Sequence, residues 1–201
     1  MADPGAGADV TLTRPDFYGQ ALVAADYERV LFSDGEFTEA RAQGARFSAC
    51  TFRGCDFGSA EFTDCAFENC TFARCSFFGA AFTGCKLVGS TFTECRFDQM
   101  AVERGDWSFV NLRGADLRHA RFGGVRLREA DLAGARASGG RLTDCDLGGA
   151  HIVRTDLRRC DLRASIITDL DPLANQLTAA IVDARQALTI AANLGLDVRD
   201  D

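Results

Sequence analysis

A period of five residues organises the chain from Ala45 to Phe97. In this run every fifth residue is large and apolar, and the residue two places before it is small. This period matches neither the 3.6 residues of an amphipathic helix nor the alternation of a half-buried strand. It indicates a solenoid, because a unit this short cannot bury its own apolar face and must stack on its neighbours.

The large position of the repeat predicts the core. It is phenylalanine nearly throughout the run, and each buried phenylalanine contributes on the order of 2 kcal/mol to folding. The predicted core phenylalanines are Phe47, Phe52, Phe57, Phe62, Phe67, Phe72, Phe77, Phe82, Phe92 and Phe97.

The same register continues outside the run. From Phe32 to Ile167 the large position recurs at every fifth residue, without insertion or deletion. The small position, however, holds the long side chain of Met100 and the branched side chain of Val110. We therefore expect an irregularity near the middle of the solenoid, but no break.

Composition limits the classes of partner. The 201 residues suit a single domain, and 29 acidic against 22 basic residues give a formal charge of −7. Binding to a phosphate backbone depends on Lys and Arg, so direct nucleic-acid binding is not expected. A net acidic protein is better suited to meet a basic surface on a partner. No apolar stretch is long enough to span a membrane, so no membrane partner is expected either.

The nine cysteines fit the repeat rather than a disulfide or metal site. All of them fall in the small position, where a free cysteine behaves as a small buried hydrophobe. Their number is odd, there is no CxxC, and the N-terminus lacks the features of a signal peptide. We expect a reduced cytoplasmic protein without a metal or other cofactor.

No catalytic constellation is visible. The chain has no GxSxG motif and no glycine-rich phosphate loop, and its two histidines, His119 and His151, belong to different columns of the repeat. The cysteine thiols should be inert in the small position. We expect no enzyme activity, and no catalytic, cofactor-binding or metal-binding residue.

The ends of the chain depart from the repeat. Residues 1–15 carry no periodicity and are expected to form a flexible tail, with a short edge strand at Val10–Thr13 as the alternative. Residues 16–183 are expected to form the β-helix, and residues 184–201 a helix and tail. Asp183 and Gln186 provide the N-cap and its capping-box partner.

The C-terminal helix should cap the open end of the solenoid, which would otherwise expose a strand edge. It is too apolar for a solvated segment, so we expect it to dimerise as well, with capping alone as the alternative. The predicted dimer interface is Leu188, Ala191, Ala192, Leu194 and Leu196.

Residues 17–198 resemble the bacterial Qnr/MfpA group of pentapeptide-repeat proteins. The repeat itself carries the resemblance, together with the segments Val182–Leu188 and Ala191–Leu196, which look like the helix through which that group dimerises end to end. The uninterrupted register is more similar to the MfpA type than to the Qnr type, whose coils carry projecting loops.

This resemblance implies both a fold and a function. The fold is a right-handed quadrilateral β-helix with four pentapeptides per turn, so residues 20 apart should stack. Seven coils about 4.8 Å apart would make a rod roughly 34 Å long. Proteins of the group mimic DNA in width and charge, bind DNA gyrase (GyrA or GyrB) and sometimes topoisomerase IV, and lower sensitivity to fluoroquinolones or other gyrase poisons.

The charges fit a DNA mimic only in part. Residues 26–70 hold nine acidic and four basic residues, whereas residues 113–163 hold seven acidic and eleven basic ones. Opposite charges alternate at coil spacing in several columns, but Arg121 lies above Arg141. The candidate partner-facing acidic residues are Asp106, Asp116, Asp131, Asp146, Asp156 and Asp161.

The mixed charge of the second half keeps two other functions open. One is a structural or scaffolding module with an unrelated protein partner. The other, a weaker hypothesis, is direct nucleic-acid binding through the arginines of residues 113–163. For any single charge, a solvated surface position is the plainest interpretation.

Overall fold

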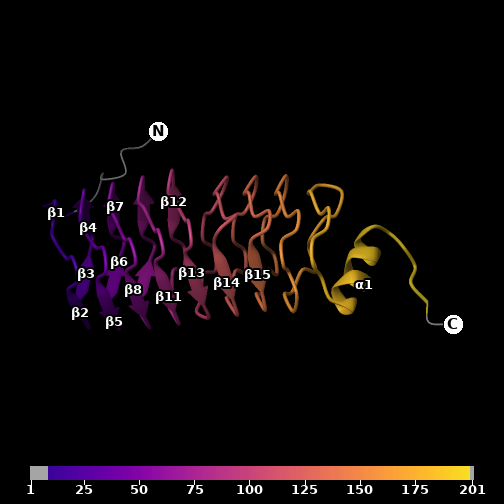
Figure 1. Cartoon of the computed structure of the whole chain (residues 1–201), viewed down its shortest axis with the longest axis horizontal. Coiled ribbons are helices and arrows are strands. Elements are labelled where there is room, and N and C mark those ends of the chain that lie inside the picture. The colour runs from indigo at the N-terminus through magenta and orange to yellow at the C-terminus, as the bar shows by residue number, and fades with distance from the viewer. Residues whose placement is uncertain (1–8, 200–201) are drawn as a thin grey trace.

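The computed structural model of the protein describes residues 9–199. Its strands are short and parallel, and each pairs with a strand one coil further along, as Val10 pairs with Val30 and Arg41 with Glu61. The chain forms a solenoid of about seven turns with a short helix at its C-terminal end (Figure 1). The all-β solenoid predicted from the five-residue period is confirmed.

Three faces of the rod carry strands, and we name each after its first strand. The β1 face contains β1 (Val10–Thr13), β4 (Val30–Ser33), β7 (Thr51–Arg53), β10 (Thr71–Ala73) and β12 (Thr91–Thr93). The β2 face contains β2 (Ala21–Val23), β5 (Arg41–Gln43), β8 (Glu61–Thr63), β11 (Ala81–Thr83), β13 (Ala101–Glu103), β14 (Arg121–Gly123) and β15 (Arg141–Thr143). The β3 face contains β3 (Asp26–Glu28), β6 (Arg46–Ser48) and β9 (Ala66–Glu68).

The fourth face, which we name the bridge face, pairs through single residues. Its column runs through Asp16, Glu36, Asp56, Ser76 and Arg96, and then through Asp116, Arg136, Asp156 and Gln176. Similar bridges extend the other faces toward the C-terminus, for example from Asp146 to Ile166 on the β3 face. Every residue just before a large position therefore lies in a column parallel to the rod axis.

Backbone hydrogen bonds join each coil to the next. The amide of Phe17 donates to the carbonyl of Glu36 at 2.8 Å, and the amide of Glu36 donates to the carbonyl of Pro15 at 2.9 Å. The same pattern repeats along the rod, which satisfies backbone groups that would be costly to leave unpaired.

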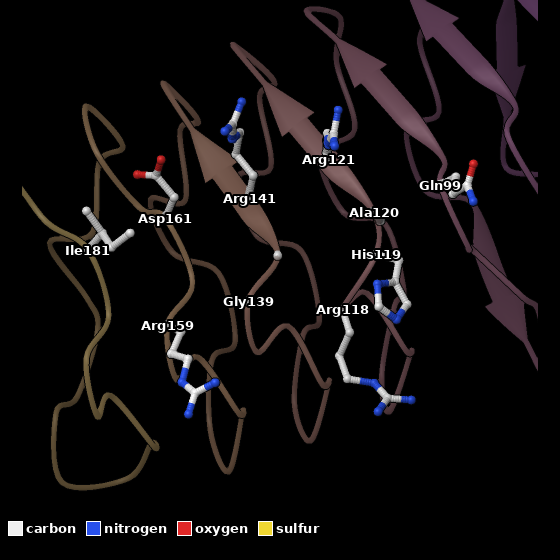
Figure 2. A pocket seen from close by; sticks show the side chains of 11 residues that line it. Gln99, Arg118, His119, Ala120, Arg121, Gly139, Arg141, Arg159, Asp161 and Ile181 are labelled. Atoms are coloured by element: carbon white, nitrogen blue, oxygen red, sulfur yellow. The ribbon is translucent and has the colours of Figure 1, made fainter.

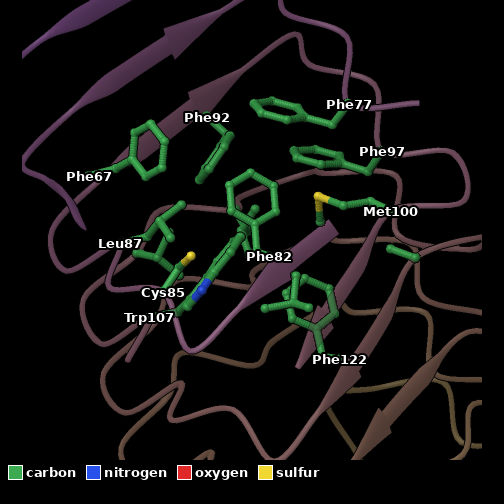
Figure 3. Close-up of a cluster of buried hydrophobic side chains, with 14 of the residues drawn as sticks. Phe67, Phe77, Phe82, Cys85, Leu87, Phe92, Phe97, Met100, Trp107 and Phe122 are labelled. Atoms are coloured by element: carbon green, nitrogen blue, oxygen red, sulfur yellow. The ribbon is translucent and has the colours of Figure 1, made fainter. Parts of the chain in front are cut away.

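Aromatic stacks fill the N-terminal half of the rod. Phe32, Phe52, Phe72 and Phe92 lie one above another with ring centroids 4.7–4.8 Å apart. Neighbouring columns meet edge to face, as Phe47 and Phe52 do. Both arrangements are favourable for aromatic quadrupoles. All ten predicted core phenylalanines are buried, and Figure 3 shows part of this cluster.

The small positions contribute hydrogen bonds as well as space. The thiol of Cys70 donates to the carbonyl of Phe47 at 3.2 Å, and the hydroxyl of Ser90 donates to the carbonyl of Phe67 at 2.6 Å. Burial raises the pKa of the Cys145 thiol to about 11 and that of Cys160 to about 12. The described cysteines are all free thiols.

The middle of the rod contains the largest change in packing. Met100, Trp107 and Val110 are completely buried there, and Figure 3 shows Met100 and Trp107 among the neighbouring phenylalanines. Gly105 is in a small position with φ 91°, and a Cβ on it would collide with the carbonyl oxygen of Cys85. Only glycine fits this close approach of two coils. The coil continues beyond it, as the sequence predicted.

The N-terminal expectation is wrong for part of the tail. Val10–Thr13 form strand β1, which pairs along its whole length with β4. The apolar Leu12 packs against the core, so this segment extends the first coil instead of remaining flexible. Residues 1–8 lie outside the described part of the chain.

Helix α1 (Ala184–Asn193) covers the C-terminal end of the rod. Asp183 caps it, and the capping box with Gln186 is present. Buried Gln186 donates to the carbonyls of Leu162 and Ser165, and Asn193 donates to the carbonyl of Leu170 at 2.8 Å. Side-chain amides thus add hydrogen bonds to carbonyls at the C-terminal end of the rod and attach the helix to it.

Substitution of Phe67 tests the inward assignment. Its ring stacks on Phe47 at 4.7 Å and is 1% exposed, so Phe67→Ala should lower the free energy of unfolding by about 3–5 kcal/mol. Phe109→Ala is the control, because that ring is 62% exposed, and its effect should stay within about 0.5 kcal/mol. Urea unfolding measures both, and a loss below about 1 kcal/mol for Phe67→Ala would contradict the assignment.

Candidate protein-interaction surface

The outward side chains lie in columns because the coils keep one register. The residues directly before and after each large position point away from the core, and the same position on the next coil lies one strand spacing away, about 4.8 Å. Two charges in one column are therefore close enough to attract or repel each other strongly. The charge that the surface presents to a partner therefore depends on which charged side chains are neighbours in a column.

All six candidate partner-facing aspartates are engaged by arginines of the rod itself. The shortest separations run from 2.6 to 3.3 Å between a guanidinium nitrogen and a carboxylate oxygen. The pairs are Asp106–Arg126, Asp116–Arg118, Asp131–Arg113, Asp146–Arg128, Asp156–Arg158 and Asp161–Arg163. Asp116 also contacts Arg136 on the next coil at 3.0 Å.

Three of these pairs have the same two-pronged geometry. In Asp156–Arg158, the arginine Nε donates to Oδ1 at 2.8 Å and Nη2 donates to Oδ2 at 2.7 Å. Asp116–Arg118 and Asp161–Arg163 repeat this arrangement. Bidentate pairing is the strong form of the arginine–carboxylate interaction. These aspartates are therefore partly neutralised within the molecule.

The pairing changes the proton affinity of the carboxylates. The hydrogen bonds from Arg158 lower the pKa of Asp156 to about 2. Hydrogen bonds from Arg118 and Arg163 likewise lower the pKa of Asp116 and of Asp161. Each of these groups favours the folded state when it is ionised.

The N-terminal half carries carboxylates that no arginine holds. Asp16, Glu36 and Asp56 follow one another on the bridge face, and within residues 9–199 none of them forms an ion pair. Each accepts a hydrogen bond from the backbone amide two residues further on, at 2.9–3.0 Å. The carboxylates are thus held in place while their charge stays open to a partner. We name this set the acidic column.

The six aspartates chosen from the sequence are therefore paired with arginines, whereas the unpaired acidic column was not among the chosen residues. A signal for this was available in the motifs Asp-Leu-Arg at 116–118, 156–158 and 161–163, where both charged residues flank one inward leucine. Side chains on either side of an inward residue share one face, so they can reach each other.

Of the predicted dimer residues, Leu188, Ala191 and Ala192 lie on α1, Leu194 is its C-cap, and Leu196 follows the helix. Leu188 is 53%, Leu194 44% and Leu196 60% exposed. Ala191 is half-buried and Ala192 is exposed. Ile190 packs against the core from the opposite side of the helix. An apolar outer side of this kind is available for a further contact.

Other kinds of site are not formed by the described residues. Residues 9–199 contain no group of three or more His, Cys, Asp or Glu side chains placed to hold a metal ion. No helix in the same range is long and apolar enough to cross a membrane.

These features define a four-sided parallel β-helix assembled from five-residue units. The sequence matches the family described as "Pentapeptide repeat region" over residues 45–132 and 75–152, and "Pentapeptide repeats (8 copies)" over residues 141–171. The chain belongs to the pentapeptide-repeat family. No curated protein matches it at a significant level.

Solved structures with the same fold include a fluoroquinolone resistance protein. A trypsin-treated variant of QnrB1, a plasmid-mediated fluoroquinolone resistance protein, is 20% identical, with a TM-score of 0.52, and the alignment covers 89% of this chain and 100% of that one. Full-length QnrB1 is 23% identical, with a TM-score of 0.48 over 93% and 98% of the two chains. HetL, involved in heterocyst differentiation regulation in the cyanobacterium Nostoc sp. strain PCC 7120, is 18% identical, with a TM-score of 0.36 over 85% and 86%.

The ion pairs predict a dependence of stability on pH. The pKa of Asp156 is about 2 in the folded protein and near 3.9 in an unfolded chain, so its contribution is present above about pH 4 and is lost as pH falls toward 2. Asp156→Asn should therefore lose less stability between pH 5 and about pH 2 than the wild type.

Thermal unfolding followed across this range measures the difference. Asp144→Asn is the control, because Asp144 is exposed and forms no ion pair within residues 9–199. It should show the same acid dependence as the wild type. An equal change in both variants would mean that the Asp156–Arg158 pair does not stabilise the fold.

Proposed function

We propose that this protein is a dimeric DNA mimic that binds DNA gyrase, with topoisomerase IV as a second target, and protects it against fluoroquinolones or other gyrase poisons. The acidic column of Asp16, Glu36 and Asp56 is the observation that carries the proposal. It places carboxylates at a regular spacing along the rod, and within residues 9–199 none of them forms an ion pair with an arginine.

The spacing suits a surface that binds DNA. A DNA strand presents one phosphate about every 3.4 Å of helix axis, and the coils of the rod repeat about every 4.8 Å. A basic groove on a topoisomerase could therefore meet several of these carboxylates at once. A negative patch meeting a positive one also accelerates association.

The family relation supports the drug part of the proposal. QnrB1 shares the fold and is described as a fluoroquinolone resistance protein. The uninterrupted coils of the present chain resemble the MfpA type more than the looped Qnr type, and this resemblance is the reason for proposing the MfpA type. In this mechanism the rod occupies the DNA-binding surface of gyrase and limits the drug-stabilised cleavage complex.

A gyrase assay tests the proposal. Purified protein at micromolar concentration should change supercoiling by gyrase or reduce fluoroquinolone-induced DNA cleavage. The triple variant Asp16→Asn, Glu36→Gln, Asp56→Asn should weaken this effect about tenfold or more, because it removes the unpaired charge and keeps the hydrogen-bond acceptors.

The matched control removes three charges that are already paired. The triple variant Asp106→Asn, Asp131→Asn, Asp146→Asn has the same change in net charge and should keep most of the effect. If wild-type protein leaves supercoiling, cleavage and drug sensitivity unchanged, the gyrase proposal fails. If both triple variants change the effect on gyrase equally, the acidic column is not the surface that contacts gyrase.

We also propose that two copies associate through the outer side of α1 and the residues that directly follow it. Leu188, Leu194 and Leu196 leave apolar area exposed beside the end of the rod. A second copy related by a twofold axis would cover this area with the same residues, as in most homodimers. The dimer would then double the length of the rod.

Charge substitutions on α1 test the dimer. Leu188→Asp or Leu194→Asp should give monomers with the same β-sheet circular dichroism, because both side chains lie away from the core. Phe109→Asp is the control, since Phe109 is 62% exposed in the middle of the rod and should leave the dimer intact. Light scattering measures the mass, and dimeric α1 variants would refute this interface.

A structural or scaffolding role with an unrelated protein partner is the second candidate function. The observation that favours it is the internal pairing of all six candidate aspartates, which leaves the second half of the rod without a continuous negative band. In that case the rod would present a mixed surface to an unrelated protein, and the gyrase assay would show no effect.

A further inference from the structure

A groove with a volume of 620 Å³ runs along the corner between the bridge face and the β2 face in the C-terminal half. Figure 2 shows Arg121 and Arg141 side by side on one wall, with Arg118 and Arg159 on the other. Ala120, Gly139 and Gly140 also line the groove, and they keep its middle free of large side chains.

Three arginines of this groove differ from Arg118 and from most other arginines in the second half, which pair with aspartates. Arg121 and Arg141 are direct neighbours on paired strands, and within residues 9–199 neither forms an ion pair. Arg159 is also exposed and without an ion pair in that range. The nearest carboxylate on the wall, Asp161, is held through both oxygens by Arg163.

Uncompensated cations at neighbouring positions repel each other. In the column that contains Asp116 and Arg136, alternating signs remove this cost. In the groove, Arg121 and Arg141 lie one strand spacing apart, about 4.8 Å, with the same sign. Asp161 follows Arg141 in the same column and attracts it, but both oxygens of Asp161 are held by Arg163. An anionic ligand would reduce the remaining repulsion, so the groove suits a negatively charged ligand although the chain has a net charge of −7.

The groove is long rather than round. The wall residues Gln99, His119, Gly139 and Arg159 come from four successive coils, so the wall is roughly 14 Å long at the coil spacing. An extended peptide advances about 3.3 Å per residue, so four or five residues span this distance. Its successive side chains point to opposite sides, which matches cations on both walls.

We propose that this groove binds an extended acidic segment of a partner protein, with carboxylates on Arg121, Arg141 and Arg159. The guanidinium groups lie on opposite walls and do not converge on one point, so several carboxylates along a chain satisfy them better than one phosphate does. Single-stranded nucleic acid would need aromatic side chains for its bases, and the only aromatic ring in the lining is the imidazole of His119.

Fluorescence anisotropy with the full-length protein tests the proposal. The probe is a fluorescein-labelled peptide of six glutamates at low salt. Wild-type protein should bind it saturably, and the affinity should fall as salt rises. The double variant Arg121→Gln, Arg141→Gln should lower the affinity about tenfold or more, and Arg159→Gln should lower it as well.

A matched control separates this groove from general charge. The double variant Arg126→Gln, Arg128→Gln has the same change in net charge, but these arginines pair with Asp106 and Asp146 outside the groove lining. It should retain the wild-type affinity within about twofold. Circular dichroism confirms that each variant keeps the fold.

Three outcomes would overturn the proposal. They are no saturable binding of the peptide by the wild type, an equal loss in both double variants, and tighter binding of pyrophosphate or a ten-nucleotide thymidine strand than of the peptide. The test is independent of gyrase, because the triple variant of the acidic column should still bind the acidic peptide.

Discussion

The backbone hydrogen bonds between coils are the interaction on which the whole structure depends. Each coil donates to and accepts from the coils on either side, so every coil must keep the same length and the same register. A one-residue insertion would move a large side chain out of the core and a polar one into it. The uninterrupted series from Phe32 to Ile167 reflects this constraint.

The same constraint decides the electrostatics. Because the coils align, two charges at the same position of successive coils cannot avoid each other, and such neighbours have either opposite or equal signs. Asp116 and Arg136 represent the first case, with a contact of 3.0 Å. Glu36 above Asp56 and Arg121 above Arg141 represent the second. The repeated signs lie at two separate places on the rod, one negative and one positive, and both proposed contacts use them.

The fold could be predicted because one periodic pattern runs through most of the chain and is typical of a known family. The large and small positions and the cap at Asp183 follow from the spacing of residues. The stacking distance of 20 residues was implied by the resemblance to the pentapeptide-repeat family, and the strand pairing confirms it. The structure of Val10–Thr13 was harder to predict, because a single strand at the end of a rod has too few residues to show a period. Only its pairing with β4 reveals it.

The surface was harder to predict. The sequence shows which residues share a column, but it does not show which arginine reaches which carboxylate. Arg118 turns toward Asp116 within its own coil, whereas Arg126 reaches Asp106 one coil away. The groove is lined by Ala120, Gly139 and Gly140 as well as by the arginines, and these small residues leave room between the two walls. Neither fact follows from charge counts.

The stacking of coils also gives this β protein an unusually local set of contacts. A paired residue is almost always 20 positions away, so the relative contact order is roughly 0.1 in a chain of 201 residues. That value is typical of helical bundles. In most β-sandwiches and barrels the contacting residues are much further apart in the sequence, so the relative contact order is higher. Each new coil can form on the previous one without waiting for distant segments. The rod should therefore fold quickly and in one dimension, growing from coil to coil until α1 closes its end.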